Sequence, residues 1–195
     1  MPMSDDAMLD RIFRVAATKT KFLPQEVPDS LLEEVWDLAK MGPTSANNQP
    51  LRIVFVRSSE AKALLEPALS SGNRPKVMAA PVCAIFAFDR HFYELLPRLW
   101  PHSDARSWFT GDQSKADAAG AMNATLQAAY FMLAARAKGL GCGPMAGFDK
   151  AKVDAAFFPD GRWSTIFLCN LGFGDPAEQR QRNPRLSFDE ACQVR

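Results

Sequence analysis

Asparagine, glutamine, serine and threonine crowd into one short loop, which reads Gly-Pro-Thr-Ser-Ala-Asn-Asn-Gln-Pro over residues 42–50. Their amide and hydroxyl groups supply hydrogen-bond donors and acceptors together, so the loop could bind the polar edge of a heteroaromatic ring. The same residue types also favour ordinary turns. Composition alone therefore leaves both interpretations open.

Two other segments carry groups that suit a ligand. In the turn at residues 71–76, Asn73 and Lys76 could hold a phosphate or a carbonyl group, and a solvated surface loop is the alternative. At residues 141–148 the sequence Gly-Cys-Gly-Pro-Met-Ala-Gly-Phe would let the backbone approach a ligand closely, with free N–H groups pointing at it. This segment lacks the spacing of a dinucleotide-binding or phosphate-binding glycine loop. A helix C-cap followed by a turn would also explain it.

Three arginines lie close together near the C-terminus, in Arg-Gln-Arg-Asn-Pro-Arg at residues 180–185. The guanidinium fork suits a phosphate monoester. A solvated face is the alternative for this basic tail.

Helix and strand patterns place these segments at the ends of regular elements. Ser30 and Glu33 form a capping-box sequence that predicts the start of a helix, which a glycine-proline pair ends. Residues 82–88 are continuously apolar, as in a central strand covered on both faces. Gly139 and Asp149 are expected to cap two helices. Further helices are expected at 6–17, 60–69, 114–138, 150–157 and 187–193, further strands at 51–57 and 165–171, an irregular stretch at 89–113 and a glycine-rich loop at 141–147.

Strands separated by helices predict a sheet covered by helices, in an α+β or α/β fold. The 195 residues suit one domain, and 47% hydrophobic with 23% charged residues is typical of a globular protein. A net charge of +1 gives no general attraction to nucleic acid or to a membrane surface. The N-terminus is acidic where a signal peptide needs basic residues, so we expect a cytoplasmic location.

Metal binding is not expected from the cysteines. The four of them are widely spaced without a Cys-x-x-Cys pair, and the chain has only two histidines. A zinc site needs about four such ligands at suitable spacing. The cysteines are expected to be buried or incidental thiols.

Together the polar segments resemble the nitroreductase family. They look like that family's motifs and follow its order along nearly the whole chain. The matching residues are Pro43–Asn47 with Gln49-Pro50, Asn73 with Lys76, Pro144–Asp149, and Gly172 and Gly174 with Arg182 and Arg185.

The resemblance implies an α+β fold with a mixed sheet flanked by helices, in a single domain over residues 1–195. It also implies a homodimer with two FMN sites at the subunit interface. NADPH or NADH would be the electron donor.

The resemblance further implies a role for each segment. Thr44, Ser45 and Asn47 would reach the flavin of the partner subunit. Asn73 and Lys76 would meet the polar edge of the ring, where a cation stabilises the negative charge that builds up on reduction. The backbone of the glycine-rich segment would face N5. The residues implied in FMN binding are Thr18, Lys19, Lys21, Pro43, Thr44, Ser45, Asn47, Asn73, Lys76, Pro144, Met145, Ala146, Gly147, Arg182 and Arg185.

Two positions depart from the family pattern. The family opens with an Arg-x-Ser-x-Arg phosphate clamp, but residues 17–21 read Ala-Thr-Lys-Thr-Lys. Lysine is not a bidentate fork, so Arg182 and Arg185 are the better candidates for the phosphate. Ala146 stands where many members carry glutamate, which leaves only a backbone contact there.

A closer resemblance is to the malonic semialdehyde reductases of pyrimidine degradation, in motifs at 42–47, 92–94, 101–102 with 104–110, 143–145 with 147–149, and 184–188. It implies a small aldehyde acid as substrate and 3-hydroxypropanoate as product. Arg106 is the best candidate to bind the substrate carboxylate, and Arg98 is the second. The alternative is that Arg106 pairs with Asp104 or Asp112 at the surface.

The proton donor and the substrate class stay open at this point. His102, Thr44, Ser45 or a water could supply the proton, although a histidine in an aromatic loop is more often hydrogen-bonded structure. One alternative function is a broad nitro- or quinone-reducing flavoenzyme. The other is a flavin-binding protein without turnover.

Overall fold

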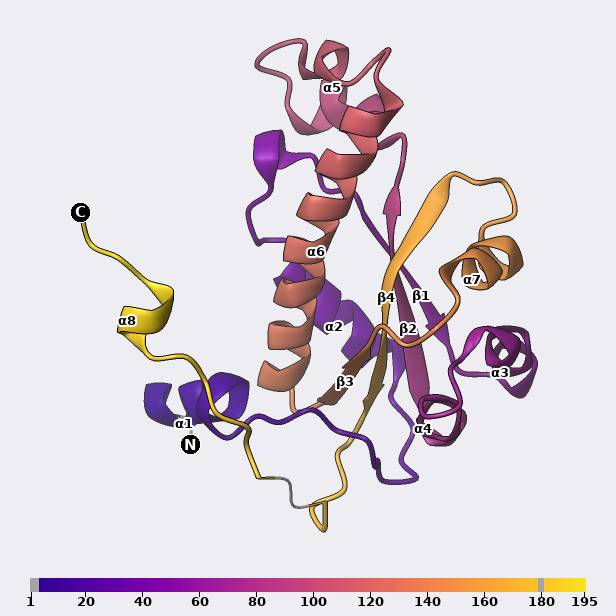
Figure 1. Ribbon diagram of the computed structural model, residues 1–195, viewed down its shortest axis with the longest axis vertical. Helices are drawn as coiled ribbons and strands as arrows, with labels where there is room; N and C mark the ends of the chain where they lie inside the picture. The colour runs from indigo at the N-terminus through magenta and orange to yellow at the C-terminus, as the bar shows by residue number, and fades with distance from the viewer. Residues whose placement is uncertain (1–3, 179–180) are drawn as a thin grey trace.

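The computed structural model describes residues 4–178 and 181–195 and has a four-stranded sheet at its centre (Figure 1). Every neighbouring pair of strands in this sheet is antiparallel. The prediction of an α+β fold is confirmed, but the sheet in the described residues is antiparallel and not mixed. Along the sheet the strands are β1 (Leu51–Val56), β2 (Val82–Asp89), β4 (Trp163–Gly172) and β3 (Gly141–Met145).

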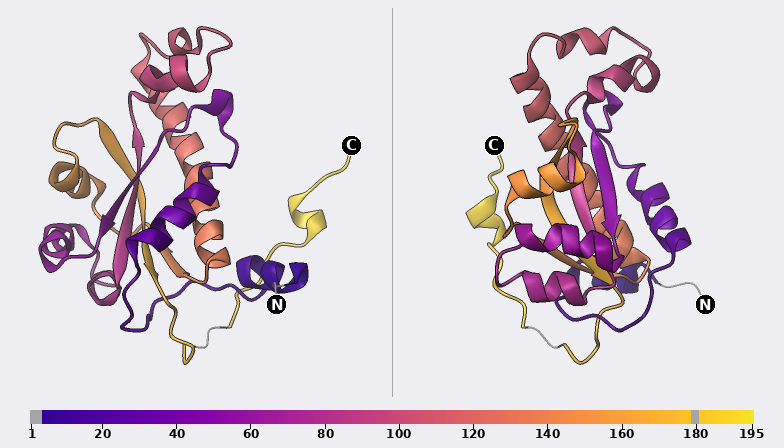
Figure 2. Two further views of the ribbon diagram at one scale, coloured as in Figure 1. Left: turned by 180° about the vertical axis from the view of Figure 1, so that it is seen from behind. Right: turned by 90° about the vertical axis from the view of Figure 1, so that its right-hand side faces the viewer.

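Helices cover both faces of the sheet (Figure 2). Helices α2 and α6 pack on one face, and α3, α4 and α7 pack on the other. The helices are α1 (Asp5–Leu9), α2 (Asp29–Ala39), α3 (Ser59–Leu65), α4 (Arg74–Ala79), α5 (Leu96–Leu99), α6 (Gln113–Ala137), α7 (Lys150–Phe157) and α8 (Phe188–Ala191).

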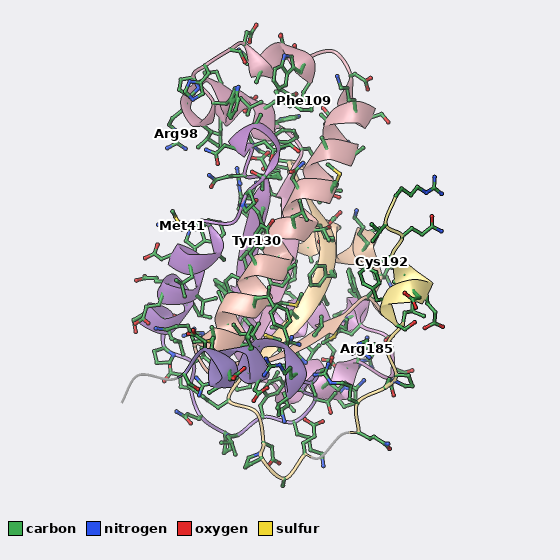
Figure 3. The ribbon with its side chains drawn as sticks, turned by 90° about the vertical axis from the view of Figure 1, so that its left-hand side faces the viewer. Met41, Arg98, Phe109, Tyr130, Arg185 and Cys192 are labelled. Carbon is green, nitrogen blue, oxygen red and sulfur yellow. The ribbon has the colours of Figure 1, made fainter. Side chains whose placement is uncertain are left out.

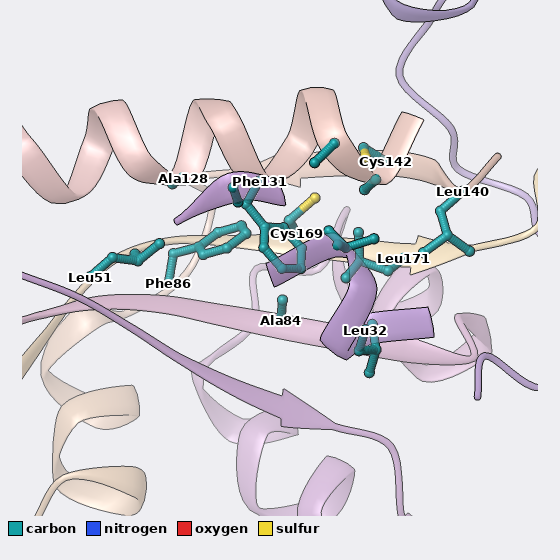
Figure 4. Packing of buried hydrophobic residues seen from close by; sticks show 14 of the residues in the cluster. Leu32, Leu51, Ala84, Phe86, Ala128, Phe131, Leu140, Cys142, Cys169 and Leu171 are labelled. Atoms are coloured by element: carbon teal, nitrogen blue, oxygen red, sulfur yellow. The ribbon is translucent and has the colours of Figure 1, made fainter. Parts of the chain in front are cut away.

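Strand β2 is the buried centre of the fold, as its continuous apolar run predicts. All eight of its residues are buried. Phe86 faces α6, where its ring meets that of Phe131 edge-on at 5.5 Å between centroids (Figure 4). Ile85 points to the other face and joins the core under α3 and α7. Alternate residues of one strand therefore build two separate cores.

The first two helices differ from the sequence prediction at their ends. Helix α2 begins at Asp29 and not at Ser30, because the carbonyl of Pro28, which has an extended backbone, accepts the N–H groups of Leu31 and Leu32. The predicted capping box is therefore not formed. The first helix was expected to continue to residue 17, but α1 ends at Leu9 and a wider helical turn at Asp10–Arg14 follows. No residue of this region is buried enough to hold a longer helix in place.

The segment at 141–147, predicted as a glycine-rich loop, is largely strand β3. Its glycines allow the chain at residue 19 to run alongside: a Cβ on Gly143 would lie 2.4 Å from the carbonyl oxygen of Lys19. The N–H of Lys19 donates to the carbonyl of Cys142 at 2.9 Å. Pro144 is tolerated because β3 is an edge strand of the described sheet. The glycines serve close packing between chain segments, which composition does not distinguish from a turn.

Residues 90–112, called the apical segment below, extend beyond the end of the sheet in short helical turns (Figure 1). The prediction of an irregular stretch is confirmed. At its base the buried carboxylate of Asp89 accepts Nη2 of Arg52 at 2.9 Å and Nε of Arg162 at 3.0 Å. Oxygen Oδ1 of Asp89 also accepts the N–H of His91 at 2.9 Å. The segment therefore starts from a firmly bonded point.

Across residues 4–178 and 181–195, no helix combines the length and the apolar character that crossing a lipid bilayer requires. The same residues contain no group of three or more His, Cys, Asp or Glu side chains that could hold a metal ion. Arg180, the first arginine of the predicted basic tail, and Met1–Met3 of the acidic N-terminus lie outside the described residues.

Candidate functional site

Asn73, Lys76 and the end of the glycine-rich segment meet on the α4 side of the sheet. Nδ2 of Asn73 donates to the carbonyl of Gly147 at 3.1 Å, and Nζ of Lys76 donates to Oδ1 of Asn73 at 3.3 Å. The N–H groups of Ala146 and Gly147 have no acceptor among the described residues. A cation, an amide and free backbone donors thus lie together, as the family resemblance implied. We call these four residues the amide–lysine cluster.

The backbone of this cluster is packed too tightly for a side chain. A Cβ on Gly147 would lie 2.7 Å from Nδ2 of Asn73 and 3.0 Å from Oγ of Ser70. Asn170 on β4 holds the backbone of the cluster in place, since its Nδ2 donates to the carbonyl of Lys76 at 3.0 Å. Oδ1 of Asn170 is buried and has no partner in the described part of the chain. Asn170 was not predicted, and its only sequence signal is an amide inside an apolar strand.

The loop at residues 43–50 is held by side chains of α6. The N–H of Ser45 donates to Oδ1 of Asn123 at 2.8 Å, and the hydroxyl of Tyr130 donates to the carbonyl of Pro43 at 3.2 Å. Where the loop enters β1, the N–H of Leu51 donates to Oε1 of Gln127 at 3.0 Å. Asn123 and Gln127 are buried. Sequence reasoning missed them, although two amides four residues apart in an alanine-rich helix are a usable signal.

Three residues of this loop have left-handed backbone angles without being glycine. The φ angles are 48° at Ala46, 49° at Asn47 and 39° at Gln49. Such conformations cost free energy and occur mainly where function or packing requires them. Nδ2 of Asn47 donates to the carbonyl of Leu99 at 3.0 Å, so the loop also touches the apical segment. The amide of Asn48 is fully buried, and neither of its polar atoms has a described partner.

The 43–50 loop does not meet the amide–lysine cluster of its own chain. It lies on the α2 and α6 side of the sheet, whereas α4 and the cluster lie on the other side (Figure 1). The structure therefore separates two groups of residues that the family resemblance assigns to flavin binding.

Replacing Asn123 with leucine should lower the free energy of unfolding by about 1 kcal/mol, because the N–H of Ser45 loses its acceptor. Urea denaturation measures this change. Amide hydrogen exchange supplies an internal control: exchange should accelerate at Ser45 but not at Leu51, which Gln127 still holds. Equal protection at Ser45 in both proteins would contradict the assignment.

A pocket of about 430 Å³ collects the predicted phosphate-binding arginines. Thr18, Arg182 and Arg185 line it, together with Ala16, Ala17, Gln181 and Asn183. Arg182 already donates to the carbonyls of Phe13 and Ala16. Among the described residues, Arg185 bonds only to carbonyls of its own turn, at 2.8 and 3.1 Å, both through Nη1. Its other donors have no described acceptor, so Arg185 is the better placed of the two to bind an anion. We call this the tail pocket.

Lys19 and Lys21 do not join Thr18 in the tail pocket. The side chain of Lys19 runs along Gly141 and Gly174 into a neighbouring pocket. The backbone N–H of Lys21 donates to a carboxylate oxygen of Glu178 at 3.3 Å, and its side chain is exposed. The expectation that both lysines bind the same phosphate as Thr18 has no support from these positions.

The apical segment carries the candidate substrate residues. His102 is exposed and packs its ring edge-on against Trp100, at 5.2 Å between centroids. Arg106 is exposed and forms no ion pair with a described carboxylate. The alternative partners are used elsewhere: Asp104 accepts the N–H of Ser107 and Asp112 accepts the N–H of Lys115. Arg106 is therefore available to an external anion. Arg98 is also exposed and is labelled in Figure 3.

Cys83 and Cys169 are poorly placed for thiolate chemistry. Cys83, Cys142 and Cys169 are buried, and Cys192 in the tail is exposed. Burial raises the pKa of the Cys83 thiol to about 12. Contact with Cys142 and burial together raise the pKa of Cys169 well above its usual value. A reactive thiolate needs the opposite shift. The contact with Cys169 lowers the pKa of Cys142, but this thiol is buried.

Residues 16–173 match the sequence model of the Nitroreductase family. The chain is 52% identical over 194 residues to the Ralstonia nicotianae protein named "Putative NADH dehydrogenase/NAD(P)H nitroreductase RSc1004", with all of both chains covered. It is 57% identical over 190 residues, 97% of each chain, to a protein of the same name, Smlt0482, from Stenotrophomonas maltophilia.

Solved structures share the fold. A "putative nitroreductase in complex with FMN" from Exiguobacterium sibiricum is 18% identical with a TM-score of 0.85, covering 100% of this chain and 99% of that one. A nitroreductase family protein from Streptococcus pneumoniae is 23% identical with a TM-score of 0.82, covering 94% and 98%.

Proposed function

The chain belongs to the nitroreductase family, and on that premise we propose that it is an FMN-dependent oxidoreductase that takes electrons from NADPH or NADH. The observation that carries the proposal is the amide–lysine cluster. The names of the Ralstonia and Stenotrophomonas relatives support the nicotinamide donor, and the FMN complex of the Exiguobacterium protein supports the cofactor.

The cluster fits the polar edge of a flavin ring. Asn73 and Lys76 offer an amide and a cation to ring carbonyls, and the free N–H groups of Ala146 and Gly147 offer two backbone donors. The absence of a side chain at Gly147 lets Asn73 pack directly against this backbone. When bound, FMN supplies the centre that accepts and gives up hydride. Lys76 would stabilise the negative charge on the reduced ring, and Arg185 in the tail pocket would bind the phosphate.

A direct experiment tests this function. The purified protein should be yellow and release FMN when denatured, and it should oxidise NADPH or NADH in the presence of an electron acceptor. Lys76→Met should lower turnover, because the ring then loses its cation, while the fold measured by circular dichroism stays the same. A protein that stays colourless after incubation with FMN would contradict the proposal. Bound flavin without turnover would favour the alternative of a binding protein.

The separation of the 43–50 loop from the cluster supports a homodimer. One flavin can contact both groups only if the loop comes from a second copy. The α2 and α6 side, which faces the viewer in Figure 3, also exposes large apolar side chains. Met41 is 77% exposed, and Met122 and Leu126 lie one turn apart on α6 at 58% and 43%. Apolar side chains gathered on one face are typical of an interface.

Leu126→Asp should raise the dimer dissociation constant at least about tenfold, because it places a charge in a buried interface of over ~2,000 Å². In this variant, the molar mass measured by light scattering and the absorbance of bound flavin should decrease together. Leu64→Asp on α3 is the matched control, since Leu64 is 59% exposed on the other side of the sheet. A wild-type monomer with full flavin content would contradict the shared site.

The substrate proposed here is malonic semialdehyde, reduced to 3-hydroxypropanoate in pyrimidine degradation within the cytoplasm. The proposal rests on the motifs of the apical segment and on the free guanidinium of Arg106. His102 is the candidate for the proton donor in that segment. The alternative, a broad nitro- or quinone reductase, is supported by the names of the relatives. Rates on malonic semialdehyde and on a nitroaromatic, measured side by side, decide between them.

A further inference from the structure

A second cationic pocket adjoins the tail pocket on the other side of residues 16–17. Its volume is about 340 Å³, and it lies between the turn after α1, the C-terminal end of α6 and the start of β3. Its charged lining residues are Arg11, Lys19 and Arg136. We call it the α6 pocket. Neither Arg11 nor Arg136 has been given a role so far.

The charges of the α6 pocket are not neutralised within the chain. None of the described residues that line it is acidic, and none of its three cations forms an ion pair with a described carboxylate. Arg14, one turn from Arg11, behaves differently because it pairs with Asp6 and Asp10 at 3.1 and 3.0 Å. Three uncompensated cations around one small pocket repel each other, and an anion between them would remove that repulsion.

The two arginines are held in place by single backbone contacts that leave donors over. Nη1 of Arg136 donates to the carbonyl of Ile12 at 3.1 Å, and Nη1 of Arg11 donates to the carbonyl of Ala137 at 3.3 Å. A guanidinium has five N–H donors. Nε of Arg136 is buried and has no partner in the described part of the chain. Capping the carbonyl end of α6 explains the bond of Arg11, but it leaves this buried donor unexplained.

The third cation is also fixed in position. A Cβ on Gly141 would lie 2.8 Å from Cγ of Lys19, and one on Gly174 would lie 2.9 Å from its Cε. The stem of Lys19 therefore runs in a channel that exists only because both neighbours are glycines. Its backbone is bonded to β3 through Cys142. A lysine held along its length loses little further freedom when it binds a ligand.

We propose that the α6 pocket binds a phosphate monoester. Two guanidinium groups and one ammonium carry three positive charges, enough to neutralise a charge of about −2, and they offer donors to the three acceptor oxygens of that group. Its source is FMN if Arg185 of the tail pocket does not bind the FMN phosphate, in which case Arg11 and Arg136 replace the arginines missing from residues 17–21, and otherwise it is the nicotinamide donor NADPH. The assignment of the phosphate to FMN rests on the proposed function, whereas phosphate binding by the α6 pocket does not.

Arginine side-chain NMR with inorganic phosphate tests the pocket directly. The Nε–H signal of Arg136 should shift in a saturable way, while that of Arg14 should not. Arg136→Lys keeps the charge but removes the fork and the buried Nε, and it should weaken phosphate binding about tenfold. Lys19→Met, a second variant with an uncharged stem, should weaken it as well, and Arg14→Lys is the matched control. Equal small shifts at Arg136 and Arg14 would indicate a general salt effect and overturn the proposal.

Two further measurements identify the source of the phosphate. If it belongs to FMN, Arg136→Lys should raise the Kd for FMN about tenfold and leave that for riboflavin unchanged. If it belongs to the donor, the variant should raise KM for NADPH and not for NADH. A variant with unchanged affinity for inorganic phosphate, FMN and NADPH would refute the site. A wild-type protein that binds no flavin would refute the proposed function, while the phosphate titration would still decide the pocket.

Discussion

Replacing Arg185 with alanine should weaken FMN binding by about 1.5–3 kcal/mol, or roughly 10–150-fold in Kd. Its guanidinium lines the tail pocket beside Thr18, and within the described part of the chain only its Nη1 is bonded, to carbonyls of its own turn. The other donors are available to a phosphate, and a charged hydrogen bond to a phosphate is among the stronger contacts a protein makes. Fluorescence titration of the flavin-free protein with FMN measures the loss.

Riboflavin and a second tail variant control this experiment. Riboflavin has no phosphate, so its affinity should be the same for Arg185→Ala and the wild type. Arg195→Ala removes an exposed arginine of the same tail that bonds to Gln193, and it should change neither affinity. If FMN binding survives Arg185→Ala intact, the phosphate lies elsewhere, and the α6 pocket is then its best alternative site.

Arg106→Ala should lower kcat/KM for malonic semialdehyde about 10–100-fold, on the order of 1.4–2.7 kcal/mol of transition-state stabilisation. The substrate is small, and its aldehyde carbon must lie about 3–3.5 Å from the reacting atom of the cofactor. A guanidinium that binds the carboxylate in a bidentate manner would fix that geometry. Arg106 is exposed and unpaired with any described carboxylate, as this role requires.

The loss should depend on the substrate. A nitroaromatic or quinone without a carboxylate should be reduced at nearly the wild-type rate by Arg106→Ala. Arg98→Ala tests the second exposed arginine of the apical segment in the same assays. Equal losses on acidic and neutral substrates would mean that Arg106 supports the fold or the flavin, and the acid-specific assignment would then be wrong.

The regular elements that were predicted correctly are those with a strong local cause. Residues 82–88 form a central strand because a continuous apolar run is stable only when both faces are covered. Asp149 caps α7 by accepting the N–H of Lys152, and Gly139 ends α6 with a φ of 91°. Strand β3 was missed because its glycines are required by close packing against Lys19, which is distant in the sequence. No local sequence pattern indicates that contact.

The site divides in the same way. The meeting of Asn73, Lys76 and Gly147 was predicted only through the family resemblance, since the glycine is 74 residues from the asparagine that bonds to it. The support from Asn123 was missed because it reaches Ser45 across 78 residues. A side chain that bonds to a distant backbone group has no characteristic sequence spacing from its partner, so the partner cannot be identified before the fold is known.

Helix α6 determines where this protein can vary in length. The helix spans residues 113–137, about 37 Å at 1.5 Å per residue, and contacts the apical segment, the 43–50 loop and the α6 pocket in turn. One inserted residue would rotate everything beyond it by about 100°, so Asn123, Gln127 and Arg136 could not all keep their partners. An insertion in the apical segment would not rotate its residues together in this way, because both ends of the segment are anchored and its interior is irregular. Insertions are therefore tolerable there, whereas α6 admits substitution but not a change of length.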